Sequence, residues 1–442
     1  MRVAVVGAGI SGLASAWLLD RQHEVTLFEA ASQAGGHSNT VTVREADGRT
    51  VPVDTGFIVY NERNYPLLSA LFRELGVPSD ASDMSFAVSL DQGRYEYAGD
   101  SLGKLFAQHR NVFRPGHWRM LSDILRFNRL ALEWLDDQPD STLSVGEFLR
   151  RGRFSDVLAE RYLLPMAAAI WSAPLADIRA FPAASMLAFF RNHGLLQVRG
   201  RPQWRTVRGG SRDYVRRILA GLRGRVYSDT RISRVRPERD QVAVCDAAGH
   251  RACFDRVILA VHADQAHDLL DEGYAQAREL LGGFRYSRNR AVLHSDPSLM
   301  PRRRRLWASW NYLSSTEREQ NRKVSVSYWM NRLQRLDTGN PYFVSLNPLR
   351  EPAPGLVRYE TDYAHPVLDA RALEIQQRLP GLQGEGKLWF CGAWTGHGFH
   401  EDGMRSAVAV AEDMGIRPPW DNQGAAPVTG IRARAQDSVE EA

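Results

Sequence analysis

The sequence predicts an α/β fold that combines a Rossmann-like domain with a second domain of helices and antiparallel strands. Three observations support this expectation. Residues 3–30 read as an apolar strand, a glycine-rich turn, a helix and a second strand. Residues 61–200 contain apolar and amphipathic stretches with helical spacing. Residues 285–347 alternate apolar and polar residues and are rich in aromatic rings, as antiparallel strands are.

The composition is that of an ordinary globular chain. Its 442 residues are 44% hydrophobic and 24% charged, which is enough for two domains with sizeable cores. No apolar run reaches the ~18 residues of a membrane-spanning helix, and the first residues do not resemble a secretory signal, so we expect a cytoplasmic protein. Cys245, Cys253 and Cys391 form no CxxC pair, so neither a disulfide framework nor a metal site is expected.

The basic charge is nearly all arginine. The net charge is +5, and lysine occurs only at positions 104, 323 and 387. The densest run, Arg302–Arg305, is either a solvated loop or a contact for phosphate or lipid headgroups. No zinc-finger, KH or RRM pattern accompanies it, so no nucleic-acid partner is expected. A peripheral contact with a membrane is compatible with this charge.

The first stretch has the pattern of a dinucleotide site. Gly7 permits a tight turn after the strand, Gly9 lets the backbone approach a pyrophosphate, and Gly12 lets the helix pack closely on the strand. The free N–H groups of the helix N-terminus then point at the phosphates. Glu29 ends the second strand, where a carboxylate accepts hydrogen bonds from ribose hydroxyls and disfavours a 2′-phosphate. The neighbouring residues Ser11 and Ala30 are also expected at the cofactor.

The next residues narrow the choice of dinucleotide. A second glycine pair, Gly35-Gly36, is followed by the strand "VPVDTGFIVY" with Gly56 and Phe57 at its end. At this point the sequence resembles the flavin-containing amine oxidase superfamily, which includes monoamine oxidases, protoporphyrinogen oxidase, carotenoid desaturases and UDP-galactopyranose mutase-like proteins. The resemblance implies that FAD is the cofactor and that Gly36, Gly56 and Phe57 contact it. The family's usual GGR is Gly-Gly-His here, with His37 in place of the arginine.

Similar segments recur far along the chain. The stretch at 207–222 resembles a GG motif entering a helix, and Ile232 stands where the family's backbone meets the adenine. The stretch at 388–414 is similar to the region that closes over the flavin. There Gly392 matches a pyrophosphate position, and Gly403 and Met404 match positions at the isoalloxazine. Two departures are Trp394 in place of a glutamate and Arg405-Ser406 in place of Glu-Gly.

This resemblance implies a discontinuous, amine-oxidase-like two-domain fold. The FAD-binding domain comprises residues 1–60, 200–284 and 365–416. The substrate domain comprises residues 61–199 and 285–364, that is, a helical insertion and an antiparallel sheet. The polar segment 417–442 is interpreted as a mobile or surface-draped tail.

The insertions are expected to hold the substrate. "YPLLSALFRELGV" predicts an amphipathic helix ended by Gly76 and Pro78. A long helix is predicted around residues 117–137, with one apolar face formed by Trp118, Leu121, Ile124, Leu125, Leu132 and Leu135. The apolar helices are either plain core or walls of a hydrophobic substrate tunnel. Most rings of the sheet (Trp307, Trp310, Tyr312, Tyr328 and Trp329) are interpreted as core, with one or two in the pocket.

The reaction expected from the resemblance is hydride transfer from a substrate carbon to flavin N5. His397, His400 and Glu401, which lead into the flavin-facing helix, are the best-placed candidates for proton transfer; otherwise they cap or brace the structure. Lys323 either holds a water near N5, as a lysine often does in amine oxidases, or is an exposed charge at a strand end.

The sequence resembles a bacterial subgroup of NAD/FAD-binding, amine-oxidase-like proteins in three motifs, GGHSNT, DTGFIVYNERNYP and GFHEDGM. Its members commonly neighbour cyclopropane-fatty-acid-synthase-like methyltransferases. That resemblance implies dehydrogenation or desaturation of a lipid acyl chain, methylated or not. The alternatives are oxidation of a small amine or polyamine, and a non-redox flavoprotein that uses FAD structurally or for isomerisation.

Overall fold

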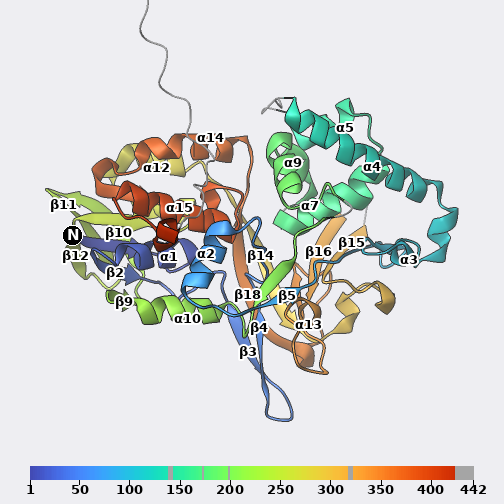
Figure 1. Ribbon diagram of the computed structural model, residues 1–442, viewed down its shortest axis with the longest axis horizontal. Helices are drawn as coiled ribbons and strands as arrows, with labels where there is room; N and C mark the ends of the chain where they lie inside the picture. The colour runs from blue at the N-terminus through green and yellow to red at the C-terminus, as the bar shows by residue number, and fades with distance from the viewer. Residues whose placement is uncertain (138–142, 172–173, 198–199, 317–321, 424–442) are drawn as a thin grey trace, which may run out of the picture.

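The computed structural model describes residues 1–137, 143–171, 174–197, 200–316 and 322–423 (Figure 1). A five-stranded parallel sheet forms one side of the molecule. In spatial order its strands are β19 (Leu388–Phe390), β13 (Arg256–Leu259), β1 (Arg2–Val6), β2 (Glu24–Phe28) and β9 (Arg225–Tyr227). Apart from β1 and β2, neighbouring strands come from parts of the chain that lie more than a hundred residues apart, as a discontinuous domain requires.

Helices pack around this sheet on the left of Figure 1. They are α1 (Ile10–Leu19), α10 (Arg212–Gly221), α11 (Ala263–Leu269), α12 (Ala275–Leu281), α14 (Ala370–Arg378) and α15 (His400–Asp413). All ten residues of α1 are buried, because α1 lies between the sheet, α10 and α15. This central position explains why the sequence of α1 is apolar on every side rather than amphipathic.

Smaller sheets adjoin this domain. One contains β10 (Ile232–Glu238), β11 (Gln241–Asp246) and β12 (Arg251–Phe254). A hairpin of β3 (Thr40–Arg44) and β4 (Thr50–Asp54) projects from the body of the molecule (Figure 1). β5 (Ser79–Ser82) pairs with β8 (Trp204–Val207), so the two ends of the first insertion lie side by side.

The second large sheet has seven strands. In spatial order they are β18 (Val357–Pro366), β14 (Tyr286–His294), β17 (Phe343–Leu346), β16 (Arg322–Trp329), β15 (Trp310–Thr316), β6 (Phe86–Leu90) and β7 (Tyr95–Ala98). The antiparallel strands expected in 285–347 are confirmed. The described part of 61–200 is mostly helical, as expected, and it also contributes β5, β6 and β7, of which β6 pairs with β15 in parallel.

The helices of the first insertion stand over this sheet, at the upper right of Figure 1. They are α3 (Leu102–Leu105), α4 (Pro115–Asp136), α5 (Val145–Arg151), α6 (Asp156–Leu158), α7 (Leu164–Trp171), α8 (Leu175–Ala180) and α9 (Ala183–Asn192). α2 (Pro66–Glu74) lies earlier, beside α15, and ends as predicted before Gly76. α13 (Met330–Leu333) follows β16 directly.

The predicted inner face of α4 was wrong in part. Trp118 and Leu125 are 52% and 64% exposed, whereas Met120, Phe127 and Ala131 are buried. The buried face is therefore rotated by about one residue's step around the helix from the face expected. The sequence pattern indicated the wrong buried face because large apolar residues occupy both faces of α4.

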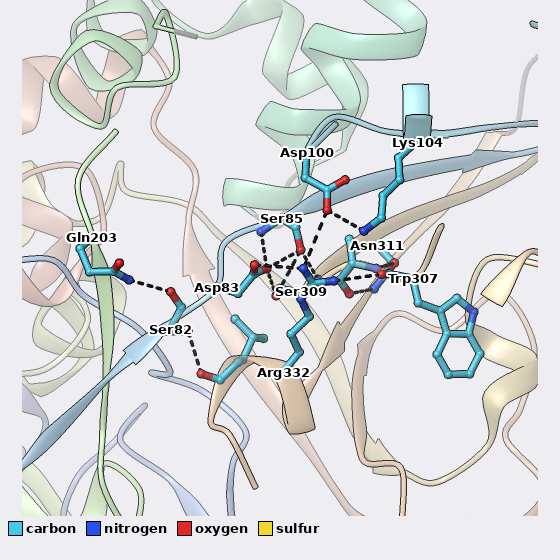
Figure 2. Close-up of polar contacts among 12 residues, drawn as sticks. Ser82, Asp83, Ser85, Asp100, Lys104, Gln203, Trp307, Ser309, Asn311 and Arg332 are labelled. Atoms are coloured by element: carbon cyan, nitrogen blue, oxygen red, sulfur yellow. Dashed lines mark hydrogen bonds and ion pairs between the residues drawn. The ribbon is translucent and has the colours of Figure 1, made fainter. Parts of the chain in front are cut away.

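A polar cluster joins α3 and α13 to the start of strands β6 and β15 (Figure 2). The Asp83 carboxylate accepts hydrogen bonds from the hydroxyls of Ser85 (2.5 Å) and Ser309 (2.7 Å) and pairs with Arg332 (3.0 Å). Although burial opposes ionisation, the serine hydrogen bonds and the arginine charge lower the pKa of Asp83 to about 2. Arg332 also approaches Asp100, which pairs with Lys104 of α3 at 2.6 Å.

The start of the C-terminal segment packs against the body of the protein. Trp420 lies in the turn Pro419–Gln423, is buried, and stacks on Trp17 of α1 with ring centroids 6.3 Å apart. The expected loose tail is therefore wrong for residues up to 423, and residues 424–442 lie outside the described part.

The rings of the large sheet are mainly core, as expected: Trp307, Tyr312 and Tyr328 are buried, and Trp310 and Trp329 are partly exposed. Lys323 is exposed near the start of β16, as in the strand-end alternative.

Candidate functional site

The glycine turn after β1 has the geometry that the sequence predicted. Gly7 has φ +98°, and a Cβ there would lie 2.6 Å from the Ala260 carbonyl oxygen. A Cβ on Gly12 would overlap the backbone of Gly7. A Cβ on Gly9 would meet no atom within 4 Å, so the turn faces open space there. No side chain caps the N-terminus of α1, which leaves its first-turn N–H groups for an anion.

Glu29 is fixed at the end of β2. Its carboxylate oxygens accept hydrogen bonds from the backbone N–H groups of Ala8 and Ala31, each at 2.8 Å. The half-buried side chain keeps further lone pairs for a sugar hydroxyl. The Glu29 carbonyl accepts a hydrogen bond from Thr230 N–H at 2.8 Å, and this contact brings the chain that leads to Ile232 beside Glu29 and the exposed Ala30.

The second glycine pair closes on the first turn. Gly35 N–H donates to the Ala8 carbonyl at 2.8 Å, and a Cβ on Gly36 would lie 3.2 Å from Cα of Gly9. α15 reaches the same place, because a Cβ on Gly403 would lie 2.7 Å from Oγ of Ser11. The structure thus brings residues from three distant segments to one helix N-terminus. Met404 is buried in the core next to Gly403.

Two departures from the family pattern stabilise this region. Ser406 accepts a hydrogen bond from Gly392 N–H at 3.0 Å and donates to the Gly403 carbonyl at 2.8 Å. Trp394 is buried, and its indole N–H donates to the Val261 carbonyl at 3.0 Å. Residues that replace the family's glutamate and glycine therefore hold Gly392 against α15 and β13 by other contacts.

His37 lies in a cluster of aromatic and imidazole rings. It stacks on Tyr363 with centroids 4.8 Å apart and lies 5.5 Å from His365 and 6.3 Å from His262. Its Nε2 is buried and has no hydrogen-bond partner among the described residues. Burial, followed by the charges of neighbouring histidines, holds the pKa of His37 well below its usual value. The arginine of the family pattern is thus replaced by a neutral ring.

The same cluster extends to the end of β4. A Cβ on Gly56 would overlap the carbonyl of His37, and Phe57 N–H donates to that carbonyl at 2.7 Å. The Tyr363 hydroxyl hydrogen-bonds to the Thr55 hydroxyl at 2.8 Å and accepts from the Asn39 amide at 3.1 Å. Gly56 and Phe57 therefore lie next to His37, as expected for residues of one site.

His400 stacks on Phe57 with centroids 3.8 Å apart. Its Nε2 lies 2.9 Å from the Ser38 hydroxyl and 3.2 Å from the Tyr214 hydroxyl, and the two hydroxyls are hydrogen-bonded to each other. Burial lowers the pKa of His400 to about 3, so the ring is neutral at physiological pH.

Glu401 binds another helix. Its Oε1 and Oε2 accept hydrogen bonds from the backbone N–H groups of Leu67 and Leu68 of α2, each at 3.0 Å. Burial raises the pKa of Glu401 to about 7, against the lowering effect of these hydrogen bonds. These contacts are those of a helix cap, which agrees with the alternative that Glu401 caps or braces the structure. A catalytic role of Glu401 stays a prediction.

His397 lies at the edge of an aromatic wall. Phe189 of α9 is 6.0 Å from His397 and stacks on Phe399 at 4.9 Å and on His193 at 3.8 Å. His193 in turn lies 6.1 Å from Trp204. The helical insertion therefore meets the loop before α15 through these rings. The catalytic role of His397 also stays a prediction.

The sequence analysis missed His262, Tyr363 and His365. Tyr363 and His365 lie near the end of β18 and His262 directly precedes α11, and only the packing of these two distant segments brings the rings together. The alternation in "YETDYAHP" signals a strand but does not reveal its neighbour. Contacts between residues this far apart in the sequence depend on the topology of the fold, which local sequence patterns do not reveal.

FAD fits this arrangement. The open space at Gly9, the uncapped N-terminus of α1, and the unpartnered Nε2 of His37 offer surfaces for a pyrophosphate and for further polar groups. Bound FAD would supply the hydride-accepting chemistry, while Glu29 and the glycines would hold it. Among the described residues, no group of His, Cys, Asp and Glu could hold a metal ion. In the same part of the chain, no helix is both long and apolar enough to cross a bilayer.

Comparisons with known proteins agree with the site. Residues 10–287 match the family model described as "Flavin containing amine oxidoreductase". A Mycobacterium tuberculosis protein named as a flavin-containing monoamine oxidase, AofH, is 30% identical over 248 residues, covering 53% of this chain and 51% of its own. The chain thus spans about half the length of that relative.

Solved structures share the fold at low identity. The structure of a fatty acid isomerase from P. acnes that produces CLA has a TM-score of 0.65 at 15% identity and covers 93% of this chain and 98% of its own. Cyclohexylamine oxidase from Brevibacterium oxydans has a TM-score of 0.64 at 16% identity, over 94% and 99% of the two chains. The match over residues 10–287, together with the glycine turns and Glu29, shows that the chain belongs to the flavin containing amine oxidoreductase family.

Proposed function

We propose that this oxidoreductase removes a hydride from an apolar substrate, and that the substrate class is a lipid acyl chain, methylated or not. The observation that carries the proposal is the state of the carboxylates near the site. Glu401 is bound by α2, and Asp402 is bound by Phe399 N–H and by Arg405, each at 3.0 Å. Asp54 accepts from Thr40 (2.5 Å) and from Ser211 N–H (2.9 Å).

An ammonium substrate is recognised by a free carboxylate or by an aromatic cage that stays open to the cation. The three carboxylates above already have protein donors, so binding an amine there would require breaking those contacts. The partly exposed rings of Phe399 and Trp204, which lie beside the buried Phe189 and beside His193, instead offer apolar surface, which favours a hydrocarbon chain. The bacterial subgroup that the sequence resembles, with its neighbouring lipid methyltransferases, supports the same substrate class.

Extraction of the purified holoprotein with organic solvent, followed by mass spectrometry, tests the substrate class. Fatty acids or phospholipid in the extract support the proposal. Anaerobic mixing with acyl substrates should then bleach the oxidised flavin absorbance. Phe399→Ala should weaken the response to acyl chains about tenfold, because it removes a partly exposed ring from the apolar surface. The matched control Val226→Ala removes exposed apolar atoms of β9, outside the substrate domain, and should leave the response unchanged.

Amine oxidation is the second candidate. It is favoured by the similarity to AofH over half of the chain. Bleaching by putrescine or a monoamine, with none by acyl chains, would establish it and overturn the lipid proposal. Conversion of an acyl substrate without net bleaching under anaerobic conditions would instead indicate an isomerisation, the non-redox alternative.

A further inference from the structure

Large apolar side chains are exposed together on one part of the substrate domain. Among the described residues, five of the eight exposed large hydrophobic side chains lie on α3, on the turn His109–Phe113 and on α4. They are Leu102 (76% exposed), Val112 (42%), Phe113 (86%), Trp118 (52%) and Leu125 (64%). We call these five residues the α3–α4 patch. Such a concentration differs from the scattered single residues that are normal on protein surfaces.

The patch is held in a defined arrangement. The Trp118 indole N–H donates to the Val112 carbonyl at 2.9 Å, and the Trp118 ring lies 5.0 Å from that of Phe106. Leu125 follows Trp118 by seven residues, so the two share one face of α4. The Asp100–Lys104 pair, linked through Arg332 to Asp83, attaches α3 to the large sheet (Figure 2). This hydrogen bond and these ion pairs therefore hold in place the backbone that carries the exposed side chains.

Positive charge surrounds the patch. Between residues 101 and 130 the only acidic residue is Asp123, which is buried and paired with Arg119 and Arg126. The basic residues of the same stretch are Lys104, Arg110, Arg114, Arg119, Arg126 and Arg129. Arg119 and Arg129 have 60% and 70% of their side chains exposed beside Trp118 and Leu125, although Arg129 also approaches Glu133 at 3.8 Å and Lys104 pairs with Asp100.

The arginine run Arg302–Arg305 adds to this charge. Leu306, directly after it, is buried in one cluster with Ala107, which precedes the turn at His109. Arg302 N–H and the Arg303 guanidinium bind the buried Glu96, which leaves Arg304 and Arg305 exposed. Two segments some two hundred residues apart in the sequence thus meet here, and both carry exposed arginines.

We propose that the α3–α4 patch docks on an anionic lipid surface. Exposed rings and leucines that insert at the boundary between headgroups and acyl chains, with arginines on lipid phosphates, form the usual combination of peripheral membrane proteins. Charge complementarity favours a lipid surface over a second copy of this chain, because a two-fold contact would bring like-charged arginines together. The inference does not depend on which substrate the flavin site takes.

Flotation of the FAD-loaded protein with lipid vesicles tests the inference. Vesicles of phosphatidylcholine with added phosphatidylglycerol should carry the protein, vesicles of phosphatidylcholine alone should carry at least about tenfold less, and added salt should release it. The double variant Phe113→Ser/Trp118→Ser should lower the partition coefficient on anionic vesicles about tenfold or more. The matched control is Val226→Ser, at an exposed apolar residue of β9 on the other domain, and it should bind as the parent does.

Retained flavin absorbance and an unchanged circular dichroism spectrum verify that the variants are folded. The Arg119→Gln/Arg129→Gln pair keeps the rings and should reduce binding to anionic vesicles only. Equal binding to both kinds of vesicle, or anionic binding unchanged in the double variant, overturns the proposal. So does light scattering that shows a dimer which dissociates in the double variant, because the patch would then be covered by a second copy.

Discussion

Glu401 and Leu68 join two helices that are more than three hundred residues apart in the sequence: Oε2 of Glu401, in the first turn of α15, accepts a hydrogen bond from the backbone N–H of Leu68 at 3.0 Å. Oε1 binds Leu67 N–H in the same way. The N-terminus of α2 is thereby capped by a side chain of the helix that reaches the cofactor site. The position of α15 and the folding of the first insertion are therefore linked.

The linkage has a pH dependence that can be measured. Burial raises the pKa of Glu401 to about 7, so the folded protein holds this proton more tightly than the unfolded chain. The contribution of Glu401 to stability is greatest below pH ~4.5 and is lost as the pH rises through about 7. Glu401→Gln should thus gain up to ~3 kcal/mol relative to the parent as the pH rises between these values, read from denaturant unfolding. In Glu133→Gln, at an exposed residue of α4, the difference from the parent should not change over that range.

Glu29→Ala should weaken FAD binding. The substitution leaves the N–H groups of Ala8 and Ala31 without their acceptor and removes the expected contacts with ribose hydroxyls, each about 1 kcal/mol. The dissociation constant of FAD, measured by quenching of its fluorescence, should rise roughly tenfold to hundredfold. Glu24→Ala, at the exposed opposite end of β2, is the control. Parent-like FAD retention in Glu29→Ala after dialysis would contradict the assignment.

Gly403→Ala should separate α15 from α1. The added Cβ would lie 2.7 Å from Oγ of Ser11 and 2.9 Å from Cγ2 of Ile10, both buried at the N-terminus of α1. Overpacking of this kind costs about 1–3 kcal/mol, and here it also displaces the turn that faces the phosphates. We expect a lower melting temperature and weaker FAD binding together. Gly381→Ala, where a Cβ meets nothing within 4 Å, should change neither.

The local parts of this site could be predicted from the sequence. The glycines at 7, 9 and 12 and the carboxylate of Glu29 follow from steric and hydrogen-bonding needs that act within one strand–helix–strand unit. That parts of 200–284 and 365–416 join this unit was expected only from a resemblance, and in the structure β13 pairs with both β1 and β19.

The parts that could not be predicted depend on partners distant in sequence. The cluster of His37, His262 and His365 forms only because β18 packs beside the segment that follows the second glycine pair. The exposed position of Trp118 depends on which face of α4 meets the sheet, and periodicity alone selects the wrong one. Trp420 looked like part of a polar tail, and only its stacking on Trp17 shows that the chain still packs on α1 there.

The histidine cluster should make the protein sensitive to acid. Burial lowers the pKa of His365 to about 4, and burial also lowers that of His400 to about 3. Between pH ~6.5 and ~4 the unfolded chain therefore binds protons that the folded protein does not, and stability falls as the pH falls through this range. His365→Gln keeps a polar partner for the Asn289 amide, which lies 2.9 Å from the histidine ring, but cannot titrate. The variant should lose less stability than the parent over this range, by ~2 kcal/mol, since the ring is half-buried. His250→Gln removes a histidine whose side chain is 83% exposed and is the matched control. The acid transition is monitored by the flavin fluorescence that appears when FAD is released. If the transition of His365→Gln overlays that of the parent, the histidine cluster takes up protons in the folded state and the prediction is contradicted.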